Sequence, residues 1–177
     1  MDGSSKIEST GYFAGVPKIV KNSIFYQLLQ RGDFFEGIYW QRHTFPQNSV
    51  ILKEGSQSGK VFFILDGVTR ISGVIEWEGR KRMRPGVRDL EAGEVFGELA
   101  LMDNMPHSTT VTAVTSCEIA VIDGKSLQDY LSENQEMGYQ VYKAISKTLV
   151  TRLRKTNEKV FSLLAWGLKE RGFHELL

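Results

Sequence analysis

The stretch from Tyr39 to Ile122 is divided by glycines into short apolar or alternating runs. The dividing glycines are Gly55, Gly59, Gly67, Gly73, Gly79, Gly86, Gly93 and Gly97. Closely spaced runs with turn signals between them are typical of an all-β barrel or sandwich rather than a parallel sheet. Within this stretch, Glu78-Gly79 is expected to turn a hairpin, and Pro85-Gly86 is expected to end its second strand.

Helical patterns flank this stretch on both sides. Apolar pairs in residues 16–31 recur at roughly helical spacing, which predicts one or two short helices. After the β region, Ser126 is a candidate N-cap, with the acidic Asp129 three residues later. A longer helix is predicted over about residues 135–166. The predicted organisation has three parts: an N-terminal tail with short helices (1–38), a β domain (39–123) and C-terminal helices (124–177).

A mainly apolar set of positions on the long predicted helix recurs at alternating steps of four and three. They are Leu149, Leu153, Thr156, Val160, Leu163 and Gly167. This spacing is the seam of a coiled coil. Two interpretations fit it: the stripe packs on the chain's own barrel, or it pairs with the same helix of a second copy. No helix-turn-helix is expected beyond it, because only residues 167–177 follow.

Composition and charge restrict the class of protein. Of 177 residues, 41% are hydrophobic and 24% are charged, and the formal net charge is +1. A nearly neutral chain has no global attraction to nucleic acid or to an anionic membrane. No apolar run is long enough to cross a bilayer, and the N-terminus lacks the apolar core of a secretory signal. The single cysteine, Cys117, excludes an intramolecular disulfide and is expected to face the core. These features predict a cytoplasmic protein.

Patterns for catalysis and metal binding are missing from the sequence. No nucleophile–base pair or pair of acids occurs at useful spacing, so an enzyme is not expected. The candidate metal or haem ligands show no pair at ligand spacing, so no metal is expected. Those candidates are His43, His107, His174 and Cys117. A basic stretch is flanked by acids, which favours a solvated hairpin over a nucleic-acid site. Its members are Arg80, Lys81, Arg82, Arg84 and Arg88.

The strongest functional pattern is a glycine turn followed by a short apolar segment and a hydroxyl-rich strand. Residues 93–102 read GEVFGELALM, and residues 106–111 read PHSTTV. Gly97 lets the backbone approach a ligand closely, because no Cβ intervenes. The residues after it predict a helix N-terminus with Glu98 in the first turn, where unpaired N–H groups and the helix dipole favour an anion. Such a segment is suited to a small phosphate and its attached sugar.

These two segments resemble the phosphate-binding cassette of cyclic-nucleotide-binding domains, FGELAL followed by a spacer and P-R-A/S-A/T-x-V. The resemblance covers about residues 45–165, and its last part is similar to the long C-terminal helix of the catabolite activator protein and its relatives. It implies a mainly β fold with flanking helices. That fold is a double-stranded β-helix, or cupin-like jelly roll, with short N-terminal helices and a long C-terminal dimerisation helix.

The resemblance also implies a ligand site. Phosphate and ribose contacts are implied for Phe96, Gly97, Glu98, Leu99, Ala100, His107, Ser108 and Thr109. Base contacts are implied for Thr156 and Asn157. Glu98 would accept a hydrogen bond from the ribose 2′-hydroxyl, which suits a carboxylate; the alternative is an acid that only favours the helix dipole. Ser108 and Thr109 are otherwise good strand formers, and Thr156 is otherwise a polar residue that sets helix register.

His107 departs from the family pattern, which has arginine at this position. Guanidinium is always charged and binds two phosphate oxygens at once, whereas imidazole is mostly uncharged at neutral pH. Three hypotheses would preserve a ligand site. A bound phosphate protonates His107, an arginine from residues 80–84 reaches the phosphate, or the pocket takes a different, less charged ligand.

Two functions follow from these observations. The first is a regulatory module without further cofactor that binds cAMP, cGMP or another small anion. It would dimerise through its C-terminal helix and signal through the dimer or to a separate output protein. The second is a degenerate fold that has lost nucleotide binding because His107 replaces arginine, and that serves as an oligomerisation or interaction scaffold.

Overall fold

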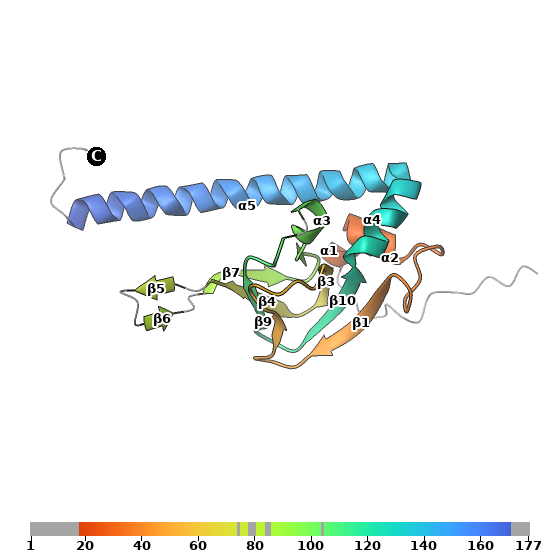
Figure 1. Cartoon of the computed structure of the whole chain (residues 1–177), viewed down its shortest axis with the longest axis horizontal. Coiled ribbons are helices and arrows are strands. Elements are labelled where there is room, and N and C mark those ends of the chain that lie inside the picture. The colour runs from red at the N-terminus through yellow and green to blue at the C-terminus, as the bar shows by residue number, and fades with distance from the viewer. Residues whose placement is uncertain (1–17, 74, 78–80, 84–85, 104, 171–177) are drawn as a thin grey trace, which may run out of the picture. The chain divides into compact units, whose positions relative to one another are not determined.

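The computed structural model describes residues 18–73, 75–77, 81–83, 86–103 and 105–170. The described residues form two four-stranded antiparallel sheets, a separate two-stranded hairpin and five helices (Figure 1). The chain divides into two compact units, residues 1–137 and residues 138–177. The first unit holds both sheets, and the second holds most of the longest helix. No described helix is long and apolar enough to span a membrane.

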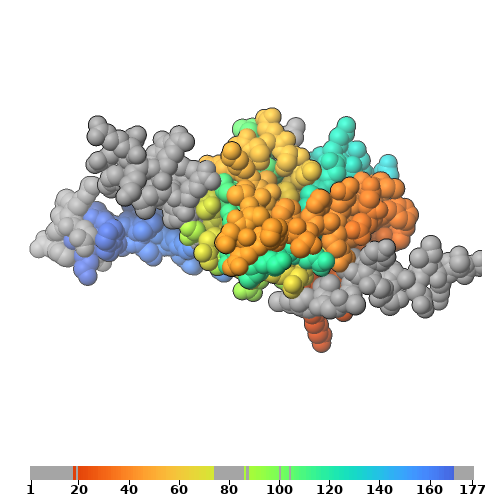
Figure 2. Space-filling view, turned by 90° about the horizontal axis from the view of Figure 1, so that it is seen from below, coloured from red at the N-terminus to blue at the C-terminus, as the bar shows by residue number. Residues whose placement is uncertain are grey.

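Strands from both ends of the β domain interleave in each sheet. The first sheet has the order β1 (Trp40–Phe45), β10 (Cys117–Asp123), β3 (Lys60–Asp66) and β8 (Val95–Phe96). The second has the order β2 (Val50–Leu52), β9 (Thr110–Ala113), β4 (Val68–Ser72) and β7 (Gly86–Glu91). Figure 2 shows β1, in orange, beside β10, in green. Because late strands lie between early ones, the predicted double-stranded β-helix is confirmed.

The predicted hairpin is present, and in sequence it lies between β4 and β7 of the second sheet. β5 (Ile75–Trp77) pairs with β6 (Lys81–Met83), and Ile75 lies opposite Met83. The predicted turn at Glu78-Gly79 falls outside the described residues, as does Pro85. β7 begins at Gly86, in agreement with a strand break at this point.

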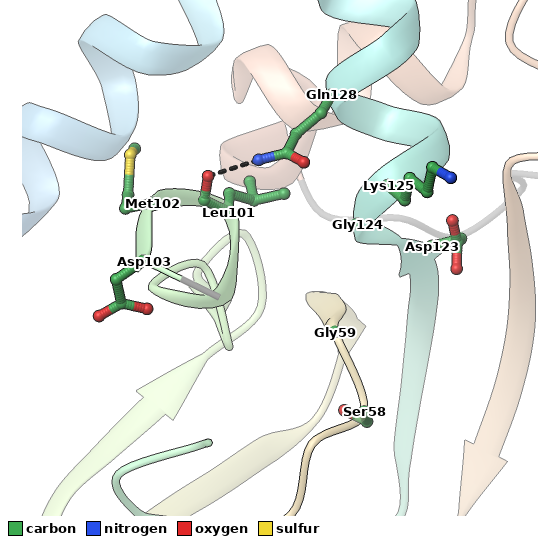
Figure 3. Close-up of a pocket in the computed structure, with 9 residues that line it drawn as sticks. All are labelled: Ser58, Gly59, Leu101, Met102, Asp103, Asp123, Gly124, Lys125 and Gln128. Atoms are coloured by element: carbon green, nitrogen blue, oxygen red, sulfur yellow. Dashed lines mark hydrogen bonds between the residues drawn. The ribbon is translucent and has the colours of Figure 1, made fainter. Parts of the chain in front are cut away.

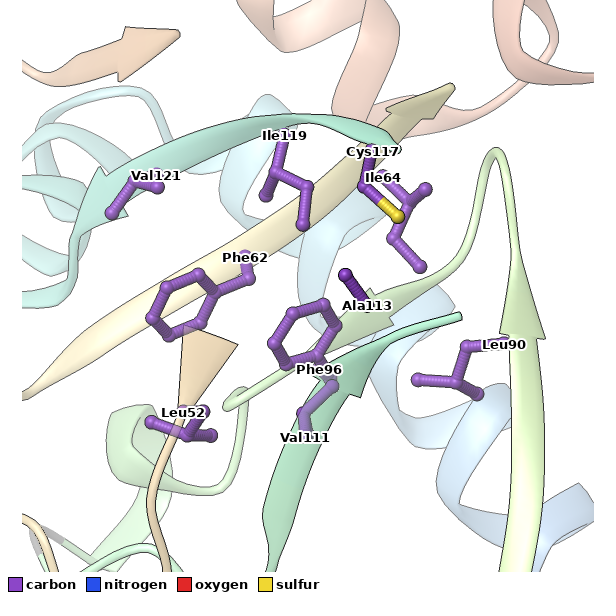
Figure 4. Packing of buried hydrophobic residues seen from close by; sticks show 10 residues of the cluster. All are labelled: Leu52, Phe62, Ile64, Leu90, Phe96, Val111, Ala113, Cys117, Ile119 and Val121. Atoms are coloured by element: carbon purple, nitrogen blue, oxygen red, sulfur yellow. The ribbon is translucent and has the colours of Figure 1, made fainter. Parts of the chain in front are cut away.

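The hydrophobic core lies between the two sheets (Figure 4). Side chains from both sheets meet there: Leu52, Phe62, Ile64, Leu90, Phe96, Val111, Ala113, Cys117, Ile119 and Val121. The rings of Phe62 and Phe96 stack with centroids 4.9 Å apart and planes 1° apart. Loss of such a ring typically costs about 3–5 kcal/mol of folding free energy. The stacked pair therefore fixes the end of β8, from which the cassette begins.

The first sheet is buried on both faces along β3. Residues 61–65 of this strand are all buried, so β3 reads as a continuous apolar run instead of an alternating one. On the face away from the core, the ring of Phe63 stacks on Phe25 with centroids 5.9 Å apart. Phe25 belongs to α2 (Ile24–Leu29), which follows α1 (Lys18–Lys21). The two short N-terminal helices predicted from the sequence are confirmed.

Asp123, not Ser126, caps the helix that follows β10. α4 spans Gly124–Glu133. The carboxylate oxygen Oδ1 of Asp123 accepts hydrogen bonds from the backbone N–H and the hydroxyl of Ser126, each at 2.8 Å. The prediction that Ser126 is the N-cap is therefore wrong. Asp123 ends β10 in an extended conformation, and its carboxylate accepts the N–H of the third helical residue. This is the geometry of an N-cap carboxylate.

The long C-terminal helix is present and extends past its predicted end. α5 spans Gln135–Glu170, whereas the sequence predicts an end near Trp166. Within the second unit, Leu153, Val160 and Leu163 of the predicted stripe are exposed. Exposed apolar side chains at this spacing form an apolar stripe along one face of the helix.

Candidate phosphate-binding site

Gly97 turns the chain immediately after β8. Its φ is +76°, a left-handed conformation that other residues rarely adopt. An ideal Cβ on Gly97 would lie 2.7 Å from the carbonyl oxygen of Lys60 and 3.0 Å from Cδ2 of Phe62. Both the conformation and the available space therefore require glycine. The backbone of the cassette turn packs directly on β3.

The segment after Gly97 is a turn before it becomes helical. The carbonyl of Glu98 accepts a hydrogen bond from the N–H of Leu101 at 3.1 Å, and α3 spans only Ala100–Asp103. The prediction that Glu98 lies in the first turn of a helix is therefore wrong, because the left-handed glycine starts a separate turn. A helix of one turn aligns few peptide dipoles, so it supplies little of the anion attraction expected from a helix N-terminus.

Two residues of the predicted site are buried although both carry ionisable groups. Glu98 is 3% exposed and His107 is 7% exposed. In the described part of the chain, the other buried polar residues are Thr69 and Thr110. Ionisable side chains are rarely buried, because losing water costs free energy that partners must offset. Burial therefore distinguishes Glu98 and His107 from the other acids and histidines whose side chains the structure describes.

His107 is held by the loop between β2 and β3. Its N–H donates to the carbonyl of Ser56 at 3.0 Å, and its carbonyl accepts from the N–H of Gly55 at 2.8 Å. The ring nitrogen Nε2 lies 2.7 Å from the hydroxyl oxygen of Ser58. Sequence reasoning missed Ser58, because the two residues lie far apart in the chain and no spacing rule connects them.

Burial lowers the pKa of His107 below its ordinary value of 6.5. The imidazole is therefore mainly neutral at neutral pH, with one ring nitrogen as donor and the other as acceptor. It offers no permanent positive charge to a phosphate. Ser108 beside it is exposed, and Thr109 is half-buried.

The predicted phosphate site has two halves, the turn at Gly97 and the segment at His107. Both lie against the same segment of chain. Lys60 and Phe62 are the neighbours of Gly97, and Ser58 is the neighbour of His107. Residues 58–62 thus support both halves. The antiparallel pairing of β3 with β8 accounts for the first of these contacts, since Phe62 lies opposite Phe96.

The two predicted base contacts lie on the other unit. Thr156 and Asn157 belong to α5, and both side chains are exposed. Their contact with a base stays a prediction.

Arginines near the hairpin form ion pairs where the structure describes their side chains. Arg88 of β7 pairs with Glu94, and Arg70 of β4 pairs with Asp89 at 2.6 Å. Arg88 is therefore charge-compensated by Glu94, and compensation of the basic stretch by the acids that flank it stays a prediction. Arg80 and Arg84 lie outside the described residues, and the side chain of Arg82 does too. The hypothesis that one of these three reaches a phosphate stays a prediction.

The candidate metal ligands lie in different environments. Cys117 is buried, as predicted, and its Sγ lies 3.2 Å from the carbonyl oxygen of Val68. His43 is exposed on β1, and His174 lies outside the described residues. In the part of the chain that the structure describes, no three His, Cys, Asp or Glu residues are grouped to hold a metal ion.

The burial of His107 predicts a pH dependence of stability. The unfolding free energy is expected to fall as the pH drops below 6.5, the ordinary histidine pKa. The unfolded chain then binds a proton that folded His107 takes up only at lower pH. The stability contributed by neutral His107 is fully present above pH 6.5. It is lost as the pH falls from 6.5 to the lower pKa that His107 has in the folded protein.

Urea unfolding between about pH 7 and about pH 5 measures this dependence. His107→Gln should flatten the curve in this window, and the exposed His43→Gln should leave it as in the wild type. An unchanged slope in His107→Gln would contradict the assignment.

The sequence of the β domain matches a known family. Residues 42–134, more than half of the chain, match the cyclic nucleotide-binding domain. Over 161 residues the chain is 22% identical to a CRP-like cAMP-activated global transcriptional regulator of Mycobacterium tuberculosis, covering 85% of this chain and 68% of the regulator. It is 25% identical over 137 residues to a cyclic nucleotide-gated potassium channel of Mesorhizobium japonicum, covering 64% of this chain and 35% of the channel.

Solved structures share the fold. A cyclic nucleotide-binding domain from Methylobacillus flagellatus KT is similar with a TM-score of 0.65 and 23% identity, over 85% of this chain and 83% of that one. The catabolite activator protein of Thermus thermophilus is similar with a TM-score of 0.57 and 19% identity, over 85% of this chain and 62% of that one. Together with the interleaved sheets and the cassette turn, the match over residues 42–134 shows that the chain belongs to the cyclic nucleotide-binding domain family.

Proposed function

We propose that this protein is a regulatory module that binds a cyclic nucleotide, cAMP or cGMP. The observation that carries the proposal is the buried side chain of Glu98 directly after the left-handed turn at Gly97. In the family resemblance this position contacts the ribose. The similar regulator of Mycobacterium tuberculosis is named as cAMP-activated, which makes cAMP the first ligand to test.

The nucleotide is proposed to bind weakly. Neutral His107 replaces a charged arginine, and loss of a charge-assisted hydrogen bond costs about 1.5–3 kcal/mol. That loss corresponds to about one to two decades of affinity. Ser108 and Thr109, which retain some exposure, are the proposed donors that remain for the phosphate oxygens.

We propose that α5 makes a homodimer and carries the signal. Its exposed Leu153, Val160 and Leu163 would be buried against the partner's helix, as at a coiled-coil seam. Thr156 and Asn157 on the same helix would then contact the base. Ligand contacts made in only one arrangement of helix and barrel would shift the population toward it. The response would pass through the dimer or to a separate output protein.

Calorimetric titration with cAMP and cGMP tests the proposal directly. Glu98→Gln is expected to weaken nucleotide binding by about one to two decades, because the charge of the ribose acceptor is lost. Glu91→Gln is the matched control, since Glu91 is exposed at the end of β7. Equal affinities for the two variants would exclude Glu98 as the ribose contact. Thermal unfolding of each variant separates loss of binding from loss of fold.

A second function is favoured by the contact between Ser58 and His107. In the scaffold alternative, Nε2 of His107 remains hydrogen-bonded to the hydroxyl of Ser58, which lies 2.7 Å away, and no phosphate binds. The domain would then act through its oligomerisation surfaces alone. Absence of binding in the wild type and in an arginine variant at His107 would support this alternative.

A further inference from the structure

A second stripe of exposed side chains runs along α5 beside the proposed dimer seam. Its members recur at alternating steps of four and three, and from Val150 on each lies one position after a seam residue. They are Lys143, Lys147, Val150, Arg154, Asn157, Phe161, Leu164 and Leu168, and all are exposed. Because successive helical residues are about 100° apart around the axis, the second stripe faces a different direction from the seam. A helix paired along the seam therefore leaves most of the second stripe uncovered.

Charged and apolar residues are separated along the length of the second stripe. Its charged members are all basic and lie in the first half: Lys143, Lys147 and Arg154. Its large apolar members after Val150 lie in the second half: Phe161, Leu164 and Leu168. Glu158, the one acid within residues 138–169, lies off the stripe. The surface complementary to this stripe is therefore acidic at one end and apolar at the other.

A second copy of α5 does not supply that complementary surface. With the two helices parallel, the basic half of one stripe would face the basic half of the other, and like charges in contact weaken an interface. With the helices antiparallel, the basic half of each would face the apolar half of the other. Neither arrangement brings a basic residue of the stripe opposite an acid.

Two acids of the first unit also fit poorly as the occupant of the second stripe. Asp103 and Asp123 stand apart around the cavity between α3 and α4 (Figure 3). Hydrogen bonds from Ser126, together with nearby Lys60 and Lys125, hold the pKa of Asp123 below its ordinary value. This carboxylate is therefore already compensated within its own unit, and no continuous acidic and apolar face is formed there.

A lipid surface fits the second stripe less well than a helix does. Helices that lie on a membrane separate basic and apolar residues around the helix axis, so that one face enters the lipid along its whole length. On the second stripe the two kinds of residue are separated along the axis. A partner helix can carry acidic and apolar residues in the matching order.

We propose that the second stripe of α5 docks an amphipathic helix of a separate protein, acidic in one half and leucine-rich in the other. Acidic residues are favourable near a helix N-terminus, so the acidic half is the first half and the two helices run parallel. The complex buries the apolar half of the stripe and pairs acids with its basic half. This names the recognition chemistry of the separate output protein, and it rests on the proposed role of α5 in signalling.

A labelled synthetic helical peptide tests the proposal by fluorescence anisotropy with the full chain. Its stripe positions carry glutamate in the first half and leucine in the second. Saturable binding is expected, and it should weaken as potassium chloride is added, because exposed charges are screened. A matched peptide with glutamine in place of every glutamate should bind more weakly. Equal affinities of the two peptides would overturn the proposal.

Two neighbouring exposed leucines separate docking from dimerisation. Leu164→Gln should weaken peptide binding by about tenfold or more, because a buried leucine is lost from the complex. It should leave the oligomeric state unchanged in analytical ultracentrifugation. Leu163→Gln, on the seam, should dissociate the proposed dimer and leave the peptide affinity of each chain unchanged. A larger loss of peptide affinity in Leu163→Gln than in Leu164→Gln would place the peptide on the seam and overturn the proposal. A monomeric wild type that binds the peptide would contradict the dimer and support the docking site.

Arg154→Gln and Lys155→Gln form a matched pair of exposed cations, the first on the second stripe and the second off it. Arg154→Gln should weaken peptide binding by about two- to fivefold, and Lys155→Gln should leave it unchanged. Equal losses would overturn the proposal, because any cation on the helix would then serve. Vesicles of phosphatidylcholine and phosphatidylserine are the competing target. A chain that binds these vesicles and not the peptide would assign α5 to a lipid surface and would also overturn the proposal.

Discussion

His107→Arg is expected to tighten cAMP binding by about one to two decades relative to the wild type. Guanidinium stays charged at every accessible pH and binds two phosphate oxygens at once, whereas burial keeps the imidazole of His107 neutral. Calorimetric titration near pH 7 measures the change. The gain should be larger at high pH than at low pH, since a protonated histidine recovers part of the charge as the pH falls through its pKa.

The control for charge is His107→Gln, which keeps a neutral donor of moderate size. It should not gain affinity, and an equal gain in both variants would show that shape, not charge, limits binding. Arginine is larger than the 7% exposed histidine that it replaces, and overpacking can cost about 1–3 kcal/mol of stability. Urea unfolding therefore accompanies the titration. A folded arginine variant that binds neither nucleotide would reject the sensor in favour of the scaffold.

Gly97→Ala is expected to destabilise the domain by about 2–5 kcal/mol and to abolish nucleotide binding. Alanine in a left-handed conformation costs about 1–2 kcal/mol, and φ at Gly97 is +76°. Its Cβ would also lie 2.7 Å from the carbonyl oxygen of Lys60. Relief of that contact requires the turn to move off β3, which adds about 1–3 kcal/mol. Urea unfolding measures the total cost.

Gly55→Ala separates the two causes. Gly55 has a similar φ of +79°, but nothing lies within 4 Å of its ideal Cβ position. Its replacement should cost only the conformational part, about 1–2 kcal/mol. The excess loss in Gly97→Ala then measures the packing of the cassette turn on β3. Equal losses in the two variants would show that this packing contributes nothing.

Elements with a local signal are predictable from the sequence, and elements set by neighbours are not. The hairpin of β5 and β6 and the start of α5 agree with prediction, because turn residues and helical periodicity are local. The sequence predicts Ser126 as the cap of α4, whereas β10 brings Asp123 to that position. The sequence also predicts Glu98 in the first turn of a helix, but the turn at Gly97 delays the start of α3 to Ala100. Both errors arise where two elements join.

The sequence by itself determined the family and the interleaved β fold, and it predicts the positions that a ligand would contact. These depend on the order and spacing of residue types, which a single chain displays directly. Only the tertiary structure decided that Glu98 and His107 are buried, and that Ser58 bonds to His107. Burial and pKa depend on groups distant in sequence, which come together only when strands pair and helices pack.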